Sequence, residues 1–319
     1  MTPRLGIPIA LVVLAPLAAC PARAEAPPVA VSIAPLQGLV AGVMEGVGEP
    51  TLIQRAGSPH GYTLRPSDAR ALAEARVVFL VDPRFETFLA RPLGARSDGV
   101  RIVALAAAPG VKTVPARRGG TWEESDHDHE HHPDRDAKRD ADTGPPDWHL
   151  WLAPANARAV VAHAARVLSE ADPDNAKRYA ANAERMRRRI ETLEAELGKR
   201  LAPVRRVPYI VFHDAYRYFE DAFGLSPAGA ATVSPERPPG IRRVRAIRAT
   251  IAARRARCVF AEPQFEPALV RTLIEDTGAR AGTLDPLGAA IAPGPDSWFA
   301  LMRGLADALE TCLSGGNAR

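Results

Sequence analysis

Four of the eight histidines in this 319-residue chain fall within six positions, with acidic side chains between them. The stretch runs through Asp126, His127, Asp128, His129, Glu130, His131 and His132. Imidazole and carboxylate groups are both metal ligands, and clusters of them bind borderline-soft cations such as zinc. The surrounding segment is rich in Pro, Gly, Asp and Arg, and it has too few apolar residues to form a core. We therefore expect a solvated metal-catching loop; the alternative is a polar linker that happens to contain histidines.

Three more histidines, His60, His149 and His213, stand where a predicted strand ends or a connecting loop turns, and Asp285 occupies a fourth such place. Ligands of open α/β sheets bind at the carboxyl ends of strands. Three imidazoles and one carboxylate make a complete tetrahedral zinc shell. Their convergence from distant parts of the chain is inferred, and a lone histidine at a strand end is often structural. His163, in the middle of a predicted helix, is expected to be an ordinary surface residue.

The elements that must position these side chains alternate between strands and helices. Strands are expected at 29–33, 50–53, 77–81, 100–105, 209–212, 258–261 and 282–284, and helices at 36–44, 68–75, 82–90, 154–171, 241–254, 267–277 and 297–313. This alternation predicts an α/β fold of two lobes, each a mostly parallel sheet flanked by helices.

A long amphipathic helix is predicted between the lobes, from residue 174 to about 202. Its apolar positions are spaced by three or four residues: Tyr179, Ala183, Met186, Ile190, Leu193, Leu197 and Leu201. Twenty-nine residues at about 1.5 Å each reach roughly 43 Å, which suits a rigid connector; a helical hairpin arm or a coiled coil is the alternative. We expect an N-terminal metal-binding lobe at 25–171, with a disordered His/Asp-rich loop at about 115–146, a linking helix at 172–202 and a C-terminal metal-binding lobe at 203–319.

The N-terminus reads as a signal peptide over residues 1–24. Thirteen apolar residues follow Arg4, too few to anchor in a bilayer, and Ala22-Arg23-Ala24 provides small residues at the cleavage positions. Soluble export to the periplasm is favoured. The competing interpretation is a lipoprotein signal, Leu17-Ala18-Ala19-Cys20, in which Cys20 would be acylated.

Cysteine content and charge narrow the class of protein further. Without Cys20, Cys258 and Cys312 remain, and such a pair in an exported protein is most simply one disulfide, worth about 2–4 kcal/mol; two buried free thiols are the alternative. The net charge of +4 is small, and the arginines are scattered rather than gathered into a stripe with aromatic residues, so nucleic-acid binding is not expected.

The chain resembles the zinc-specific substrate-binding proteins of bacterial ABC importers (ZnuA-type, in the cluster A-I metal-binding family). The matching pieces cover nearly the whole mature chain in the family's order: 32–36, 57–62, 64–68, 147–152, 212–216, 260–265 and 283–288. The resemblance implies zinc binding by His60, His149, His213 and Asp285, a His-rich insertion, a Cys258–Cys312 disulfide and a membrane permease as partner of a monomer. Histidine at the third position goes with zinc, where glutamate goes with manganese or iron.

Two positions depart from the family's pattern. Pro59 stands where some relatives place a metal-binding glutamate, so a water molecule or Asp285 must complete the shell, and Trp148 rather than Pro precedes His149.

Two other functions are weighed against transport. A zinc hydrolase would need a general base; Glu262 is the obvious one, and no His-Glu-x-x-His motif occurs. A surface-anchored adhesin would follow from acylation of Cys20. Periplasmic zinc binding and delivery, without enzymatic activity, is the function that the sequence favours.

Overall fold

The computed structural model describes residues 26–95, 99–118, 120–122, 144–232, 235–236 and 239–315. The predicted signal peptide, Cys20 and the run from Asp126 to His132 lie outside these residues. Among the described residues, no helix is both long enough and apolar enough to cross a bilayer.

The N-terminal sheet has four parallel strands in the order β2-β1-β3-β4. The strands are β1 (Val29–Val31), β2 (Thr51–Leu52), β3 (Val77–Leu80) and β4 (Arg101–Ala104). Every residue of β1 and β3 is buried, as expected for parallel strands covered on both faces.

The C-terminal sheet repeats this topology. Its parallel strands lie in the order β10-β9-β7-β8, so that in both sheets the first strand in the chain lies between the second and the third. The strands are β7 (Tyr209–Val211), β8 (Pro227–Ala230), β9 (Cys258–Ala261) and β10 (Arg280–Thr283). The order reverses beside the first strand of each sheet, which is where open α/β sheets bind their ligands. The predicted α/β fold with two parallel sheets is confirmed.

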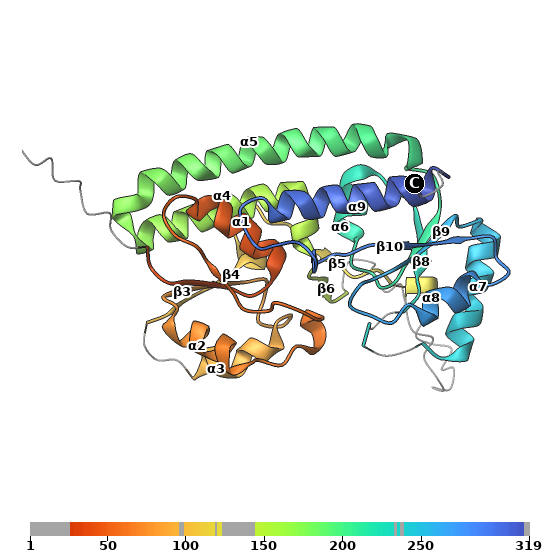
Figure 1. The fold of residues 1–319 in the computed structure, drawn as a ribbon, viewed down its shortest axis with the longest axis horizontal. Coiled ribbons are helices and arrows are strands. Elements are labelled where there is room, and N and C mark those ends of the chain that lie inside the picture. The colour runs from red at the N-terminus through yellow and green to blue at the C-terminus, as the bar shows by residue number, and fades with distance from the viewer. Residues whose placement is uncertain are drawn as a thin grey trace, which may run out of the picture.

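Four helices lie above both sheets in Figure 1, and together they enclose one continuous apolar core. They are α1 (Ala34–Met44), α4 (Pro154–Ala171), α5 (Ala176–Leu201) and α9 (Ser297–Leu313). This core joins side chains of both sheets, such as Val31 and Phe260, to Met186 of α5 and Trp298 of α9. The outer faces of the sheets carry separate apolar clusters. These are covered by α2 (Pro66–Glu74) and α3 (Ala90–Gly94), and by α7 (Ile241–Arg254) and α8 (Ala268–Ile274).

Helix α5 is the predicted long helix and runs along the length of the molecule (Figure 1). It has 26 residues, and 3-10 turns at Pro173–Asn175 and Ala202–Val204 adjoin its ends. The predicted apolar stripe faces the core, with Ile190 and Leu197 fully buried. Because α5 packs on α1, α4 and α9, it braces both sheets rather than bridging a gap between them.

The helix predicted at 82–90 is wrong in its first half. Asp82 to Glu86 form a turn, followed by a 3-10 turn at Thr87–Leu89 and by α3. The carboxylate of Glu86 accepts hydrogen bonds from the backbone N–H groups of Val81 (3.0 Å) and Asp82 (2.9 Å). These bonds hold the chain folded back on itself, a conformation that competes with a helix start.

Part of the segment predicted as a loop at about 115–146 lies among the described residues and has secondary structure there. Residues 114–118, 120–122 and 144–147 are ordered, in a short antiparallel pair of β5 (Val114–Pro115) with β6 (Pro146–Asp147) and a 3-10 turn at Gly120–Trp122. The Tyr218 hydroxyl accepts from the Val114 N–H (3.0 Å) and donates to the Asp147 carbonyl (2.7 Å). Tyr218 lies on α6 (Arg217–Phe223), a helix that the sequence pattern did not predict. Its distant position in the chain is why local composition missed this order.

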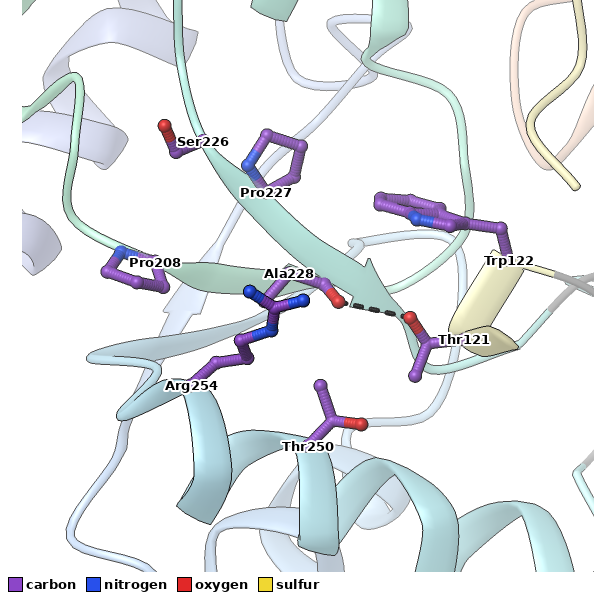
Figure 2. A pocket seen from close by; sticks show the side chains of 8 residues that line it. All are labelled: Thr121, Trp122, Pro208, Ser226, Pro227, Ala228, Thr250 and Arg254. Atoms are coloured by element: carbon purple, nitrogen blue, oxygen red, sulfur yellow. Dashed lines mark hydrogen bonds between the residues drawn. The ribbon is translucent and has the colours of Figure 1, made fainter. Parts of the chain in front are cut away.

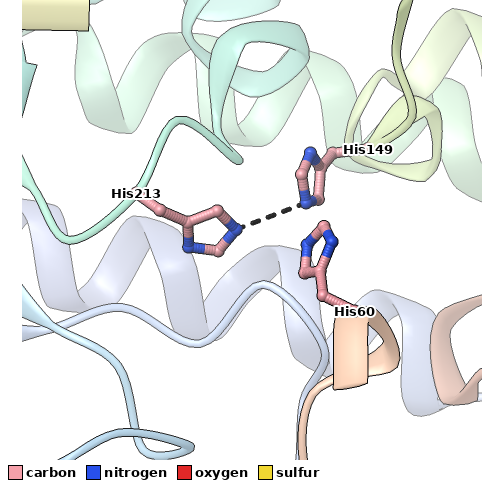
Figure 3. Close-up of side chains that lie close together, drawn as sticks. All are labelled: His60, His149 and His213. Atoms are coloured by element: carbon pink, nitrogen blue, oxygen red, sulfur yellow. Dashed lines mark hydrogen bonds between the residues drawn. The ribbon is translucent and has the colours of Figure 1, made fainter. Parts of the chain in front are cut away.

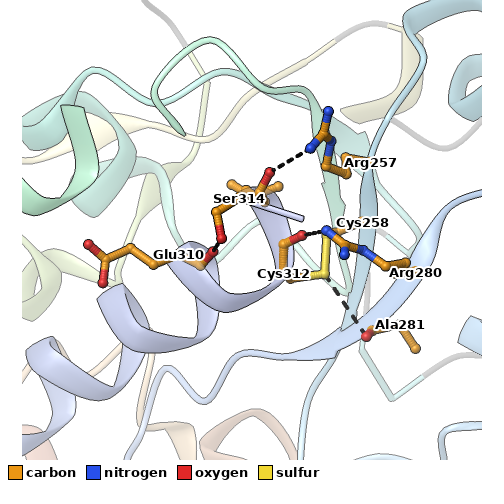
Figure 4. The surroundings of a disulfide bond; sticks show 8 residues. Arg257, Cys258, Arg280, Ala281, Glu310, Cys312 and Ser314 are labelled. Atoms are coloured by element: carbon orange, nitrogen blue, oxygen red, sulfur yellow. Dashed lines mark hydrogen bonds between the residues drawn. A yellow bond between two sulfur atoms is a disulfide. The ribbon is translucent and has the colours of Figure 1, made fainter. Parts of the chain in front are cut away.

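The predicted Cys258–Cys312 disulfide is present and joins the start of β9 to the last turn of α9, with a Cα–Cα distance of 6.2 Å (Figure 4). Two arginines cap the same helix end. The Arg257 guanidinium donates to the Leu313 carbonyl (3.2 Å), and Arg280 donates to the Cys312 carbonyl. The end of α9 is thus fixed to the C-terminal sheet at the edge opposite to the carboxyl ends of its strands.

Candidate metal centre

His60 lies in the 3-10 turn Pro59–Gly61, which follows β2. The Ser58 hydroxyl accepts a hydrogen bond from the His60 N–H (3.2 Å) and so caps the turn. The residue as a whole is exposed, but its ring stands 5.2 Å from the ring of Phe85 and close to two other imidazoles.

His149 is buried directly before the 3-10 turn Leu150–Leu152. Asp147 Oδ1 accepts from the His149 backbone N–H (2.9 Å) and from its ring Nδ1 (2.7 Å). The carboxylate assigns the proton to Nδ1, which leaves the Nε2 lone pair free to face a metal ion.

His213 is buried two residues beyond β7, and Glu262 directly follows the neighbouring strand β9. Glu262 accepts from His213 Nδ1 (2.7 Å). Because β7 and β9 are parallel neighbours, their carboxyl ends meet at one sheet edge and bring this acid and this imidazole together. The pair repeats the arrangement of Asp147 with His149.

The three imidazoles converge from separate parts of the chain, as Figure 3 shows. One ligand nitrogen of each lies within 4.8 Å of the others, and Nε2 of His213 is 3.4 Å from Nε2 of His149. Two nitrogens bound to one tetrahedral zinc ion at 2.0–2.1 Å stand about 3.3 Å apart. The spacing of His149 and His213 therefore fits a shared zinc ion.

The electrostatic surroundings of the histidines differ. Desolvation, together with the neighbouring His149 and His213, lowers the pKa of His60 to about 3, so this imidazole is neutral and ready to bind metal. Burial opposes the charge on His213 and is the largest single effect, but the carboxylates of Glu262, Asp214 and Asp147 together outweigh it and raise the pKa of this imidazole. A proton on His213 Nε2 can then satisfy the short contact with His149, and a metal ion must displace that proton.

Asp285, the predicted fourth ligand, follows β10 but is not in the cluster of metal-binding groups that the described residues form. Its carboxylate accepts from the backbone N–H groups of Leu287 (3.0 Å), Gly288 (2.9 Å) and Ala289 (2.6 Å), and from the Gln264 amide (2.9 Å). The side chain thus holds its own loop.

A larger cavity, of about 480 Å3, lies away from the histidines between the 3-10 turn Gly120–Trp122, β8 and α7 (Figure 2). The Thr121 hydroxyl donates to the Ala228 carbonyl there (3.0 Å). Its lining side chains include no histidine, cysteine or acid.

The role of the two carboxylates that orient the buried histidines was not predicted from the sequence. Asp147 carries no pattern that marks it, and Glu262 is weighed above only as the base of a hydrolase. The signal for Glu262 is its place directly after a strand, which is the criterion that identified His213. Since Glu262 is bonded to His213, it is occupied as a positioning group.

Comparison with known proteins agrees with this arrangement. The family described as "Zinc-uptake complex component A periplasmic" matches residues 29–312. The high-affinity zinc uptake system protein ZnuA of Brucella suis is 42% identical over 305 residues, which cover 90% of this chain and 91% of that protein.

Two solved structures share the fold. A ZnuA deletion mutant with zinc bound has a TM-score of 0.74 at 23% identity, covering 92% of this chain and all of that one. The laminin-binding protein Lmb of Streptococcus agalactiae, described as an adhesin with metal-transporting activity, has a TM-score of 0.71 at 22% identity, covering 89% and 98%. With a family match over most of its length and a close relative along nine tenths of it, the chain belongs to the periplasmic A components of zinc-uptake complexes.

Proposed function

We propose that this protein binds Zn²⁺ through His60, His149 and His213 and delivers it in the periplasm to the permease of an ABC-type zinc importer. The observation that carries the proposal is the convergence of three imidazole nitrogens within 4.8 Å, two of them oriented by buried carboxylates. Imidazole suits zinc better than the harder cations, which favour oxygen ligands. The name of the Brucella suis relative supports the same cargo.

The fourth position of the shell is supplied by a water molecule or by Asp285. The hydrogen bonds of Asp285 to three backbone N–H groups support water, because recruiting the carboxylate would break the cap of its own loop. Glu262, the general base that a hydrolase would need, is bonded to His213, and we propose no hydrolytic step.

The run from Asp126 to His132 is proposed to be an auxiliary metal-binding loop. Its support from the structure is the docking of its flanks. Trp122 stacks with the Arg117 guanidinium (4.5 Å), and Arg117 pairs with Asp214 (2.9 Å), the residue after His213. The role proposed for this loop is to raise the local zinc concentration or to sense an excess of zinc.

Cleavage after residue 24 and soluble export are proposed for the precursor. Mass spectrometry of the mature N-terminus tests this proposal. A diacylglycerol adduct on Cys20 would replace it with membrane anchoring and would revive the adhesin interpretation.

Release of zinc is proposed to use movement of the ligand loops rather than a wide hinge. The continuous core and α5 tie both sheets together, so a large opening would expose buried apolar surface. The loop that carries His60 lies outside this core, whereas Ala215 and Tyr216 anchor the loop of His213 in it. The loop of His60 is therefore proposed to shift when the permease binds.

Calorimetric titration with zinc tests the ligand assignment. His60→Ala and His213→Ala should each weaken zinc binding by more than about 100-fold, beyond the effect of losing an outer-shell partner. His163→Ala, on the exposed side of α4, is the matched control and should bind as the parent protein does. Deletion of residues 123–139 should leave tight binding nearly intact.

Equal losses in all four variants would contradict this division between main site and loop. Competition between zinc and manganese in the same titration should favour zinc. A preference for manganese would refute the assignment of cargo.

A further inference from the structure

We propose that Gln264 completes the zinc site through water: its side-chain oxygen accepts a hydrogen bond from the water molecule that fills the fourth metal position. The inference rests on the proposed function, because it concerns the same ion. It assigns Gln264 as a positioning residue and Asp285 as the group that orients it.

Gln264 stands on a segment that is held on both sides. Glu262, two residues before it, is bonded to His213 (2.7 Å). Phe265, the next residue, stacks on Phe212 with ring centroids 4.9 Å apart and an interplanar angle of 12°. The backbone at position 264 is therefore fixed relative to the ligand His213.

Asp285 fixes which end of the Gln264 amide faces the metal site. A carboxylate only accepts hydrogen bonds, so the amide nitrogen must face Asp285 Oδ1, at 2.9 Å. The loop of Asp285 is itself held, because the Trp151 indole donates to the Pro286 carbonyl (2.8 Å) and the Tyr216 hydroxyl donates to the Leu284 carbonyl (3.1 Å). The amide oxygen of Gln264 is consequently directed away from Asp285.

That amide oxygen is buried and has no hydrogen-bond partner among the described residues. A buried acceptor without a donor is costly, and native structures rarely keep one without a reason. The other such atom in the described part of the chain is Asp147 Oδ2, which belongs to the group behind His149. Gln264 differs because it lines the same small space as the three imidazoles.

The space between these side chains is about 10 Å3, close to the least that one water molecule needs. Three imidazoles fill three positions of a tetrahedral zinc ion and leave one. A zinc-bound water is a strong donor, and Gln264 supplies the acceptor that is otherwise unpaired. An amide oxygen does so without adding a charge to the site.

Gln264→Met tests the inference, because methionine has nearly the same length and cannot accept this bond. Gln37→Met is the matched control: Gln37 is also a buried amide, on α1, where it accepts from the Gly294 N–H (3.1 Å). Calorimetry should show zinc affinity about 10–100-fold lower in Gln264→Met and unchanged in Gln37→Met. The visible spectrum of the Co²⁺ form should change only in Gln264→Met.

A crystal structure of the zinc-loaded parent protein should show a water bound to zinc and within about 2.6–3.2 Å of Gln264 Oε1. Zinc bound directly by Asp285 or by the Gln264 amide would overturn the inference, and so would parental affinity in Gln264→Met. A parent protein that does not bind zinc tightly would instead refute the proposed function.

Discussion

At the scale of single residues, each of the two buried histidines proposed as ligands has a carboxylate behind it. Asp147 and Glu262 accept the Nδ1 proton of His149 and His213 and turn both Nε2 atoms toward one point. Such carboxylate–histidine pairs raise the basicity of the imidazole and fix its tautomer. Without these carboxylates each ring could rotate, and fixing it on the metal would cost part of the binding free energy.

Replacing Glu262 by Gln should lower zinc affinity by about 10–100-fold while the protein stays folded, because the amide holds the ring less firmly and stabilises its metal-bound form less. Calorimetry and circular dichroism measure the two effects. Glu266→Gln, at an exposed position four residues on, serves as control. Affinity within about twofold of the parent in Glu262→Gln would show that the carboxylate is dispensable.

The residue types of the site could be identified from the sequence, but the contacts could not. His60, His149 and His213 were selected because each stands at a strand end or loop, and the structure brings the three together. The same criterion selected Asp285, whose carboxylate accepts from three successive N–H groups of its own loop. Its role as a metal ligand stays a prediction. No local pattern shows which of two such outcomes a carboxylate adopts.

At the scale of elements, the turn from Asp82 to Glu86 sets one wall of the site. Glu86 is fully buried, binds the N–H groups of Val81 and Asp82, and accepts from the Ser32 hydroxyl. The turn places the Phe85 ring 5.2 Å from the His60 ring. An apolar wall here helps to keep the His60 imidazole neutral.

The stability of this turn should depend on pH. Burial raises the pKa of Glu86 to about 7, above its usual value of 4.5, so its contribution to stability is full below about pH 4.5 and is lost as pH rises through 7. Glu86→Gln cannot ionise. The Tm of this variant relative to that of the parent should therefore rise by several degrees from pH 5 to pH 8. Thermal melts at both pH values measure the change.

Glu74→Gln, at an exposed position on α2, should show no such gain. A difference between Glu86→Gln and the parent that stays constant with pH would mean that Glu86 does not ionise in this range.

The elements that the sequence predicted best are those with a strong period. The helices α4, α7 and α9 have the predicted bounds, because each carries an apolar stripe and a clear start. Helix α6 and strand β8 (Pro227–Ala230) were missed. The strand is a short Pro-Ala-Gly-Ala segment with weak strand preference, and only pairing with β7 makes it a strand.

At the scale of the whole molecule, the disulfide and the metal site lie at opposite ends of the same sheet. Cys258 begins β9 and Glu262 follows its last residue, so one strand connects the disulfide on α9 to the carboxylate behind His213. The two-lobed arrangement followed from alternating strands and helices. The alternation does not show that both sheets share one core, because this sharing depends on which helix faces pack together.

Removing the disulfide by Cys258→Ser with Cys312→Ser should cost about 2–5 kcal/mol of unfolding free energy. Zinc affinity should stay within about twofold, because the bond lies at the far end of β9. Urea unfolding and calorimetry measure the two quantities. A loss of zinc affinity above tenfold would show that the disulfide is needed for the geometry of the metal site.

The bracing of both sheets by α5 also bears on how long an ion stays bound. The release proposed above implies that a captured ion escapes only when the small loops around it part, so that its residence time is set by the height of that local barrier. Affinity and dwell time are then separate properties of the molecule. In this proposal, the protein dissociates from its ion slowly while it is free in the periplasm and rapidly once the permease has bound to it.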